Sequence, residues 1–303
     1  MRKLAIAAMT AVLATTTLAQ LRVAAVEKLP LPTGREWHNP RFSPDGARIY
    51  VTQSNYAGIW EFTKATGELR EITQDLGAGY GFALSPDGAR VAYRRFGYDD
   101  KTKLRIDQLV LRDLRGDHAS VIATGRHLSL PLFVQSDLVY SRAGALQRPF
   151  ALPPGTGVLG IEDTKIVLVR NGERIVLDPF EDGRYIWPAL SPDGTRLVAV
   201  EMSRGAFVCD VNGVVLSELG RRHAPAWTRS GRWIVYMDDR DDGHRFTSSD
   251  LMAITPDGSQ TVRLTDTVEE FEMFPACSPT ADEIVFSTMT GGIYLLRYSE
   301  EAR

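Results

Sequence analysis

The chain has 303 residues, of which 44% are hydrophobic and 24% are charged, a composition typical of globular proteins with one large domain or two ordinary ones. Its formal net charge is −3 and it has no dense Lys/Arg run, which argues against a nucleic-acid-binding protein. Beyond the N-terminus, no segment is long and apolar enough to suggest a membrane span.

The first residues have the pattern of a secretory signal peptide. Two basic residues precede an apolar run from Leu4 to Ala14, and the small residues Thr17 and Ala19 follow. The run is short for a bilayer span, which disfavours a membrane anchor, and a buried helix is the other alternative. We therefore expect residues 1–19 to be removed after Ala19, leaving a periplasmic or secreted protein. Cleavage after Ala25 is a second option that the sequence leaves open.

A Ser-Pro-Asp-Gly motif then recurs, in "RFSPDGARIYV" (41–51), "ALSPDGARVAY" (83–93) and "ALSPDGTRLVAV" (189–200). Each residue of the motif suits one position of a tight turn: Ser the first, Pro the second, Asp the third, and Gly the position that often needs a positive φ. Apolar and polar residues alternate on both sides of the turn. The motif therefore predicts a β-hairpin with one buried face.

Degenerate copies of this hairpin fill the rest of the chain. Aligned on the turn Ser or its substitute, the copies are spaced by 42, 49, 57, 37 and 50 residues and fall at Ser43, Ser85, Val134, Ser191, Thr228 and Ser278. Each unit also contains a second hairpin around a Gly turn, as in "IWEFTKATGELREIT" (59–73). Self-similarity at this period, with four strands per unit, is typical of propeller blades.

We therefore predict an all-β, six-bladed β-propeller of four-stranded antiparallel blades over residues 20–303. The last unit is one strand short, and residues 21–30 have no blade of their own. We expect these residues to complete the last blade and close the ring. The predicted blades are about 31–75, 76–125, 126–180, 181–220, 221–267 and 268–299. A five-bladed ring or an open array is the alternative, and the third unit, where the turn motif has decayed, is the weakest.

The repeat resembles that of TolB-type, WD-repeat-like propellers, in which an apolar or aromatic residue and a Pro precede Ser-Pro-Asp-Gly and an alternating strand. The propellers of prolyl oligopeptidase-family peptidases carry similar repeats. The resemblance covers about residues 21–299. It is specific for the fold and weak for function, because the motif residues build turns rather than sites.

The resemblance carries several functional expectations. TolB is a periplasmic propeller that contacts envelope proteins, but it has an α/β domain ahead of its propeller that this chain lacks room for. The peptidases carry a hydrolase domain, and no Gly-x-Ser-x-Gly occurs here. Oligogalacturonate lyases resemble this architecture and hold a metal through His side chains at one mouth of the ring.

One face of the propeller is the expected binding face. The Ser-Pro-Asp-Gly turns lie at one end of the blades, so the lead-in to each innermost strand and the loop between the second and third strands lie at the other, here named the loop face. The position five residues before each turn Ser should ring the channel mouth there: His38, Tyr80, Ser129, Ile186, His223 and Met273. A two-His metal site needs further ligands, and this set supplies them poorly, so we expect hydrogen-bonding histidines, no metal and no cofactor.

Two long loops, 96–107 and 239–250, add polar and aromatic side chains to this face. The second loop is acidic but lacks a calcium-loop pattern, which favours a solvated charged loop. Core packing is the default expectation for the Trp residues, although Trp37 and Trp187 can reach the mouth. The candidate ligand face therefore consists of His38, Tyr80, Tyr98, Asp99, Trp187, His223, Asp241 and His244.

The expected function is a monomeric, non-catalytic propeller that binds a protein or peptide partner of the cell envelope. The alternative is a small propeller enzyme, a sugar lyase or hydrolase, with its site around His38 and His223. No nucleic-acid partner and no cofactor are expected. Cys209 and Cys277, the two cysteines of the chain, are expected to be free and buried.

Overall fold

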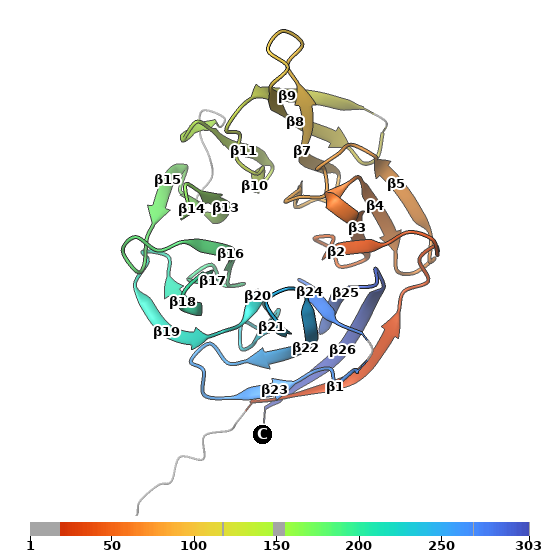
Figure 1. Cartoon of the computed structure of the whole chain (residues 1–303), viewed down its shortest axis with the longest axis vertical. Helices are drawn as coiled ribbons and strands as arrows, with labels where there is room; N and C mark the ends of the chain where they lie inside the picture. Colours follow the sequence, from red (N-terminus) through yellow and green to blue (C-terminus); the bar gives the residue numbers. More distant parts are fainter. Residues whose placement is uncertain (1–18, 117, 148–154, 269, 303) are drawn as a thin grey trace, which may run out of the picture.

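The computed structural model describes residues 19–116, 118–147, 155–268 and 270–302. The predicted signal peptide, apart from Ala19, lies outside the described residues. Within the described residues the strands form seven antiparallel sheets arranged radially around a common axis, which is a β-propeller (Figure 1). The predicted all-β propeller is therefore present, but the predicted count of six blades is wrong.

In blades 1 to 6 the innermost strand comes first in the chain. Three four-stranded blades are regular: blade 1 contains β2 (Trp37–Phe42), β3 (Arg48–Gln53), β4 (Ile59–Thr63) and β5 (Leu69–Thr73); blade 5 contains β16 (Tyr185–Leu190), β17 (Arg196–Glu201), β18 (Gly205–Asp210) and β19 (Val215–Gly220); blade 6 contains β20 (His223–Trp227), β21 (Ile234–Asp241), β22 (Phe246–Ile254) and β23 (Thr261–Arg263). A short 3₁₀ turn, η1 (Ser54–Tyr56), links β3 to β4.

Blade 2 has a long central hairpin that extends beyond the ring, at the top of Figure 1; its strands are β6 (Ala83–Leu84), β7 (Arg90–Tyr98), β8 (Arg105–Asp113) and β9 (Ala119–Gly125). Blades 3 and 4 have three strands each: β10 (Leu132–Val134), β11 (Asp137–Arg142) and β12 (Ala145–Gln147), then β13 (Thr156–Glu162), β14 (Lys165–Arg170) and β15 (Glu173–Leu177). Blade 7 contains β24 (Glu272–Cys277), β25 (Glu283–Thr288), β26 (Ile293–Ala302) and, from the other end of the chain, β1 (Ala19–Lys28).

The extra blade lies inside the predicted third unit, 126–180. The long interval between Val134 and Ser191 accommodates two short blades, because blades 3 and 4 have three strands each within the described residues. β14 is the middle strand of its own blade and pairs with both β13 and β15. The β13–β14 turn is Asp163–Thr164, with φ values of 48° and 69°, and carries no Ser-Pro-Asp-Gly signal.

The Ser-Pro-Asp-Gly turns owe their repeat to a hydrogen-bond network that each copy reproduces. In all three, the Ser Oγ donates to the Asp Oδ1 at 2.5 Å, and the backbone N–H five residues after the Ser donates back to that Oγ at 2.9 Å. The hydrogen bond from Ser191 is the main cause that lowers the pKa of Asp193 to about 2. These turns fix the register of the two inner strands of their blades.

The N-terminal strand closes the ring as the sequence predicts. β1 pairs antiparallel with β26, from Ala19 opposite Ala302 to Lys28 opposite Tyr294. Arg297 on β26 also donates to Glu27 on β1 at 2.8 Å. The two ends of the described chain therefore meet in one blade, and the outer edge of β26 is covered.

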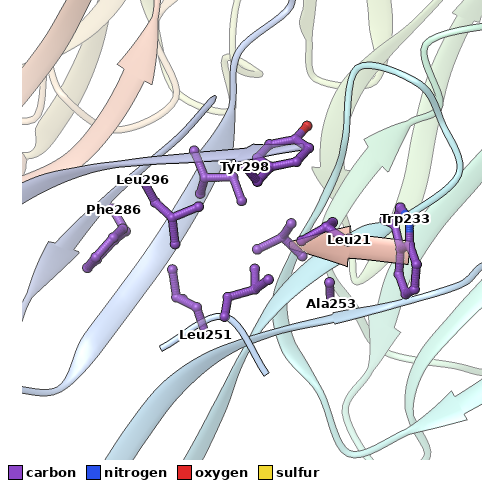
Figure 2. Close-up of a cluster of buried hydrophobic side chains, with 10 residues drawn as sticks. Leu21, Trp233, Leu251, Ala253, Phe286, Leu296 and Tyr298 are labelled. Carbon is purple, nitrogen blue, oxygen red and sulfur yellow. The ribbon is translucent and has the colours of Figure 1, made fainter. Parts of the chain in front are cut away.

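Leu21 ties this closing strand to the neighbouring blade. Its side chain is 2% exposed and belongs to a buried cluster that includes Trp233 and Leu251 of blade 6 and Phe286 and Leu296 of blade 7. Figure 2 shows Leu21 on β1 beside Trp233, with Leu251 and Leu296 nearby. Closure thus buries an apolar side chain between two blades as well as pairing two strands.

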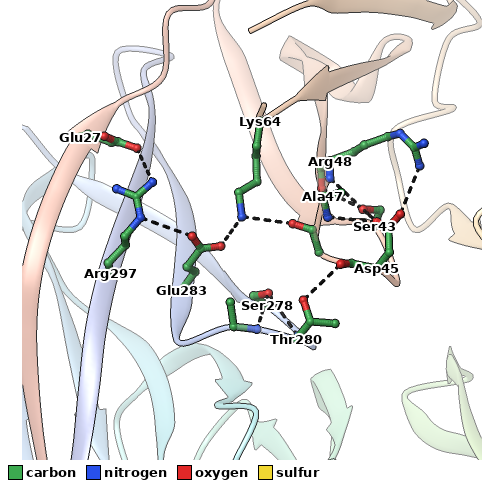
Figure 3. Close-up of polar contacts among 12 residues, drawn as sticks. Glu27, Ser43, Asp45, Ala47, Arg48, Lys64, Ser278, Thr280, Glu283 and Arg297 are labelled. Carbon is green, nitrogen blue, oxygen red and sulfur yellow. Dashed lines mark hydrogen bonds and ion pairs between the residues drawn. The ribbon is translucent and has the colours of Figure 1, made fainter. Parts of the chain in front are cut away.

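A polar network joins blade 7 to blade 1 at the end of the blades that carries the Ser-Pro-Asp-Gly turns (Figure 3). Lys64 forms an ion pair with Glu283 and donates to the Gly46 carbonyl at 3.1 Å. The Thr280 hydroxyl donates to the Asp45 carbonyl at 3.2 Å. Gly46 has a φ of +69°, and a Cβ at this position would lie 2.1 Å from Thr280 Oγ1, so the seam requires glycine there.

Both cysteines are free thiols. Cys209 is buried, and burial raises the pKa of its thiol to about 12. Cys277 is only partly buried, in contrast to the expectation, although desolvation raises the pKa of its thiol as well. Among the described residues, no helix is both long enough and apolar enough to cross a membrane.

Candidate functional site: an aromatic cluster at the channel mouth

Four of the seven innermost strands that the structure describes share a bulge near the loop face. In β2, β16, β20 and β24 the pairing with the next strand slips at one point, and one residue there has a positive φ: Asn39 (48°), Trp187 (51°), Ala224 (45°) and Phe274 (53°). Each of these residues precedes a proline. β-Bulges redirect side chains and are common next to binding sites. The bulge is therefore a feature of the scaffold, and the side chain placed on it differs from blade to blade.

Trp187 is the most unusual occupant of this bulge. A bulky residue in the left-handed region is a genuine outlier, with a cost of about 1–3 kcal/mol. The Trp187 side chain is 36% exposed, and its ring lies 5.6 Å from the ring of His223 and 6.5 Å from that of Phe274. Strands β16, β20 and β24 are the innermost strands of three consecutive blades (Figure 1). Their side chains thus bring three rings together. We call Trp187, His223 and Phe274 the aromatic cluster.

A buried carboxylate fixes the orientation of His223. The Nδ1 atom of His223 lies 2.6 Å from Oδ1 of Asp239, near the end of β21. The Asp239 side chain is 3% exposed, whereas that of His223 is 28% exposed. This contact assigns the proton of a neutral imidazole to Nδ1. Among the described residues Nε2 has no hydrogen-bond partner, so it can accept a hydrogen bond from a ligand.

The third ring is also held in place by its neighbours. The Phe274 backbone N–H donates to Met237 Sδ of blade 6 at 3.3 Å, and Phe274 packs on a buried group formed by Ala224, Met237 and Met273. Between blades 6 and 5, Trp227 Nε1 donates a hydrogen bond to the Ala189 carbonyl at 3.0 Å. These contacts make the cluster a preorganised surface.

Two further predicted residues lie on other parts of the mouth. His38 is half-buried, with Nε2 3.7 Å from a Glu36 carboxylate oxygen. Tyr80 is 46% exposed and packs edge-on against Tyr56 with ring centroids 4.9 Å apart. Blade 7 separates His38 in blade 1 from His223 in blade 6, and the structure records no contact between the two imidazoles among the described residues.

The remaining predicted residues lie on the two long hairpins. Tyr98 is 72% exposed. Asp99 caps its own turn by accepting hydrogen bonds from the backbone and side chain of Thr102, and these bonds are the main cause of its lowered pKa. Asp241 pairs with Arg221 at 2.9 Å, and His244 is exposed. The structure therefore brings Trp187 and His223 together and leaves these four outside the aromatic cluster.

The described residues do not supply a recognisable metal site. Among them, no group of three or more His, Cys, Asp or Glu side chains converges closely enough to hold an ion. His223 has the single carboxylate partner Asp239, and His38 has Glu36. The pair of histidines considered from the sequence therefore lacks the additional donors that a metal would require.

Sequence reasoning missed Phe274 and the role of Asp239. Phe274 occupies the same position of the repeat as Trp187, four residues before the turn Ser and directly before a proline. An alignment on that position, one residue after the ring position used above, would have found both. The role of Asp239 depends on how β21 lies against the bulged β20, and no local pattern signals it.

Known structures with similar folds are propellers. TolB from Acinetobacter baumannii matches with a TM-score of 0.56 at 18% identity over 81% of this chain, which spans 58% of the TolB chain. An oligogalacturonate lyase in complex with manganese matches at 0.51 and 16% identity over 88% of this chain and 78% of its own. The Cps50 (Swd1) β-propeller domain from Myceliophteria thermophila matches at 0.61 and 10% identity over 91% of this chain and 99% of its own.

These likenesses confirm the TolB-like propeller fold and go no further, because all identities are low. No protein-family model matches the chain, and no curated protein matches it.

Proposed function

We propose that the chain is an exported, non-catalytic propeller that binds a protein or peptide partner of the cell envelope through its loop face. The aromatic cluster is the anchor of that surface. The observation that carries the proposal is Trp187, a partly exposed indole held in a strained backbone conformation against two rings from neighbouring blades. Strained residues gather at binding sites, where the surrounding structure over-determines them.

The chemistry of the cluster favours a polypeptide ligand. Trp residues in preorganised pockets are frequent hot spots of protein–protein interfaces, because they bury a large area at a small loss of conformational entropy. His223 offers a hydrogen-bond acceptor beside the indole, which suits a backbone N–H or a polar side chain. The hairpins that follow β7 and β21 provide further exposed groups on the same face.

The proposal is tested by selecting peptides from a random display library on the immobilised protein and measuring their affinities by calorimetry. Trp187→Ala is expected to weaken the selected peptides by about 10- to 100-fold. Leu216→Ala, which removes a 56% exposed side chain from the outermost strand of the same blade, is the matched control and should leave the affinities unchanged. Thermal unfolding of both variants verifies that the fold is retained.

Peptides that bind both variants equally well, or a library that yields no specific binder, would contradict the proposal. Export is tested separately by determining the N-terminal residue of the mature protein, which should follow Ala19.

The His223–Asp239 pair favours a second candidate, a propeller enzyme that transfers a proton at the mouth. An imidazole oriented by a buried carboxylate is a suitable general base. The described donors do not fit the manganese bound by the lyase neighbour, so we derive no metal-dependent step. Formation of an unsaturated product from oligogalacturonate that disappears in His223→Ala would favour the enzyme over the binding protein.

A further inference from the structure

A cavity of about 290 Å³ opens at the seam between blades 6 and 7, apart from the aromatic cluster. The segment between β23 and β24 forms one wall, with Leu264, Thr267 and Glu270. Blade 7 forms the other wall, with Phe286 and Tyr294. The volume is at the small end of the range of ligand sites and suits one functional group with a few carbon atoms.

Glu272, at the start of β24, lines this cavity with an incompletely satisfied carboxyl group. The residue is 2% exposed, and its Oε1 accepts a hydrogen bond from the Thr267 hydroxyl at 2.6 Å. Its Oε2 is buried and has no hydrogen-bond partner among the described residues. A buried polar atom without a partner is costly and calls for a donor. Burial raises the pKa of Glu272, because the ionised carboxylate is poorly solvated there. A positive charge in the cavity would stabilise the ionised form.

The opposite wall is aromatic. The rings of Phe286 and Tyr294 stack with centroids 5.5 Å apart and planes inclined by 12°. Glu270 lies at the rim, where its carboxylate accepts hydrogen bonds from the Thr290 hydroxyl at 2.9 Å and from the Tyr294 hydroxyl at 3.5 Å. Lys28 of β1 already places its ammonium 5.6 Å from the centre of the Tyr294 ring. The cavity thus combines acidic oxygens with aromatic faces, and both attract cations.

We infer that this cavity binds an organic cation, an alkylammonium or guanidinium group, whose N–H donors reach Glu272 and Glu270 and whose methylenes pack on Phe286 and Tyr294. Such a group supplies the donor that Oε2 lacks and offsets the negative charge of two carboxylates. The source can be a free amine or the Lys or Arg side chain of a polypeptide. This inference does not depend on the aromatic cluster, so the cation site and the proposed peptide-binding function can be tested and disproved separately.

The inference is tested by titrating the full mature chain with n-butylammonium and with n-butylguanidinium and monitoring the NMR chemical shifts of the protein. Saturable shifts at Thr288 and Tyr294 are expected, with a millimolar dissociation constant. Glu272→Gln, which keeps the shape and removes the charge, should weaken binding at least about tenfold. Glu68→Gln, in an exposed turn of blade 1, is the matched control and should have no effect. The neutral n-butanol should bind at least about tenfold more weakly than n-butylammonium.

Equal affinity for n-butanol, equal affinity of the Glu272→Gln variant, or the absence of saturable shifts would overturn the inference. A capped lysine, Nα-acetyl-lysine N-methylamide, distinguishes the two sources. Binding comparable to that of n-butylammonium supports a polypeptide side chain as the natural occupant. Exclusion of the capped lysine, with the free cations still bound, supports a small amine.

Discussion

Replacement of Leu21 by alanine is expected to lower the free energy of unfolding by about 2–5 kcal/mol. Leu21 is fully enclosed between blades 6 and 7, and the alanine would leave a cavity against Trp233 and Leu296. The lost side chain also lies on the strand that joins the two ends of the described chain, so its packing contributes directly to closure. Chemical denaturation followed by tryptophan fluorescence and circular dichroism measures the change.

Val23→Ala is the matched control for Leu21→Ala. Val23 lies two residues along the same strand but is 37% exposed, so its truncation should cost well under half as much. If the two variants unfold at the same denaturant concentration, Leu21 does not have the buried position that the ring closure gives it.

Gly46→Ala is expected to cost about 2–4 kcal/mol, the second large effect. The φ of +69° makes any L side chain there unfavourable by about 1–2 kcal/mol. The added Cβ would also collide with Thr280 Oγ1 across the seam between blades 1 and 7. Gly67→Ala provides the matched control, because Gly67 has a φ of +71° and nothing within 4 Å of the added Cβ. The difference between the two unfolding free energies isolates the cost of the contact between blades.

The double variant Gly46→Ala/Thr280→Ala tests the same contact independently. Without the Thr280 hydroxyl the 2.1 Å contact is gone and the closest remaining neighbour is Ser278 Oγ at 3.2 Å. Gly46→Ala should therefore cost less in the Thr280→Ala background than in the wild type. Equal losses of unfolding free energy in the two backgrounds, or equal losses for Gly46→Ala and Gly67→Ala, would show that Gly46 is not in close contact with Thr280.

The sequence predicts the propeller class because Ser-Pro-Asp-Gly has a local physical cause. The Ser43–Asp45 hydrogen bond and its counterparts fix the turn within a few residues, and such local signals survive in the sequence. The number of blades is a different quantity. Blades 3 and 4 turn at Gln135 and at Asp163–Thr164, where other residues adopt positive φ values, so the repeat loses its signature where the count is decided.

The candidate site is predictable to a similar extent. The repeat alignment places Ile186 and His223 at the mouth, and Trp187 follows Ile186 directly. Trp37, also considered for the mouth, is buried in the structure. The alignment cannot reveal that the bulge turns Trp187 toward Phe274, or that Asp239 supports His223, since these contacts arise between strands and between blades. In the two long hairpins, Asp99 and Asp242 accept hydrogen bonds within their own turns, and Asp241 pairs with Arg221.

Closure of the ring supports the whole site, because Phe274 lies on β24 of the blade that β1 completes. The most direct test is a cysteine cross-link between Arg22→Cys and Ser299→Cys, two exposed residues that face each other in the β1–β26 pair. Glu27→Cys with Ser299→Cys is the control, because Glu27 pairs with Leu295, four residues away and about 13 Å along the strand. Mild oxidation should link the first pair rapidly and leave the control unlinked. An unlinked first pair, or equal linking of both, would contradict a propeller closed by its N-terminal strand.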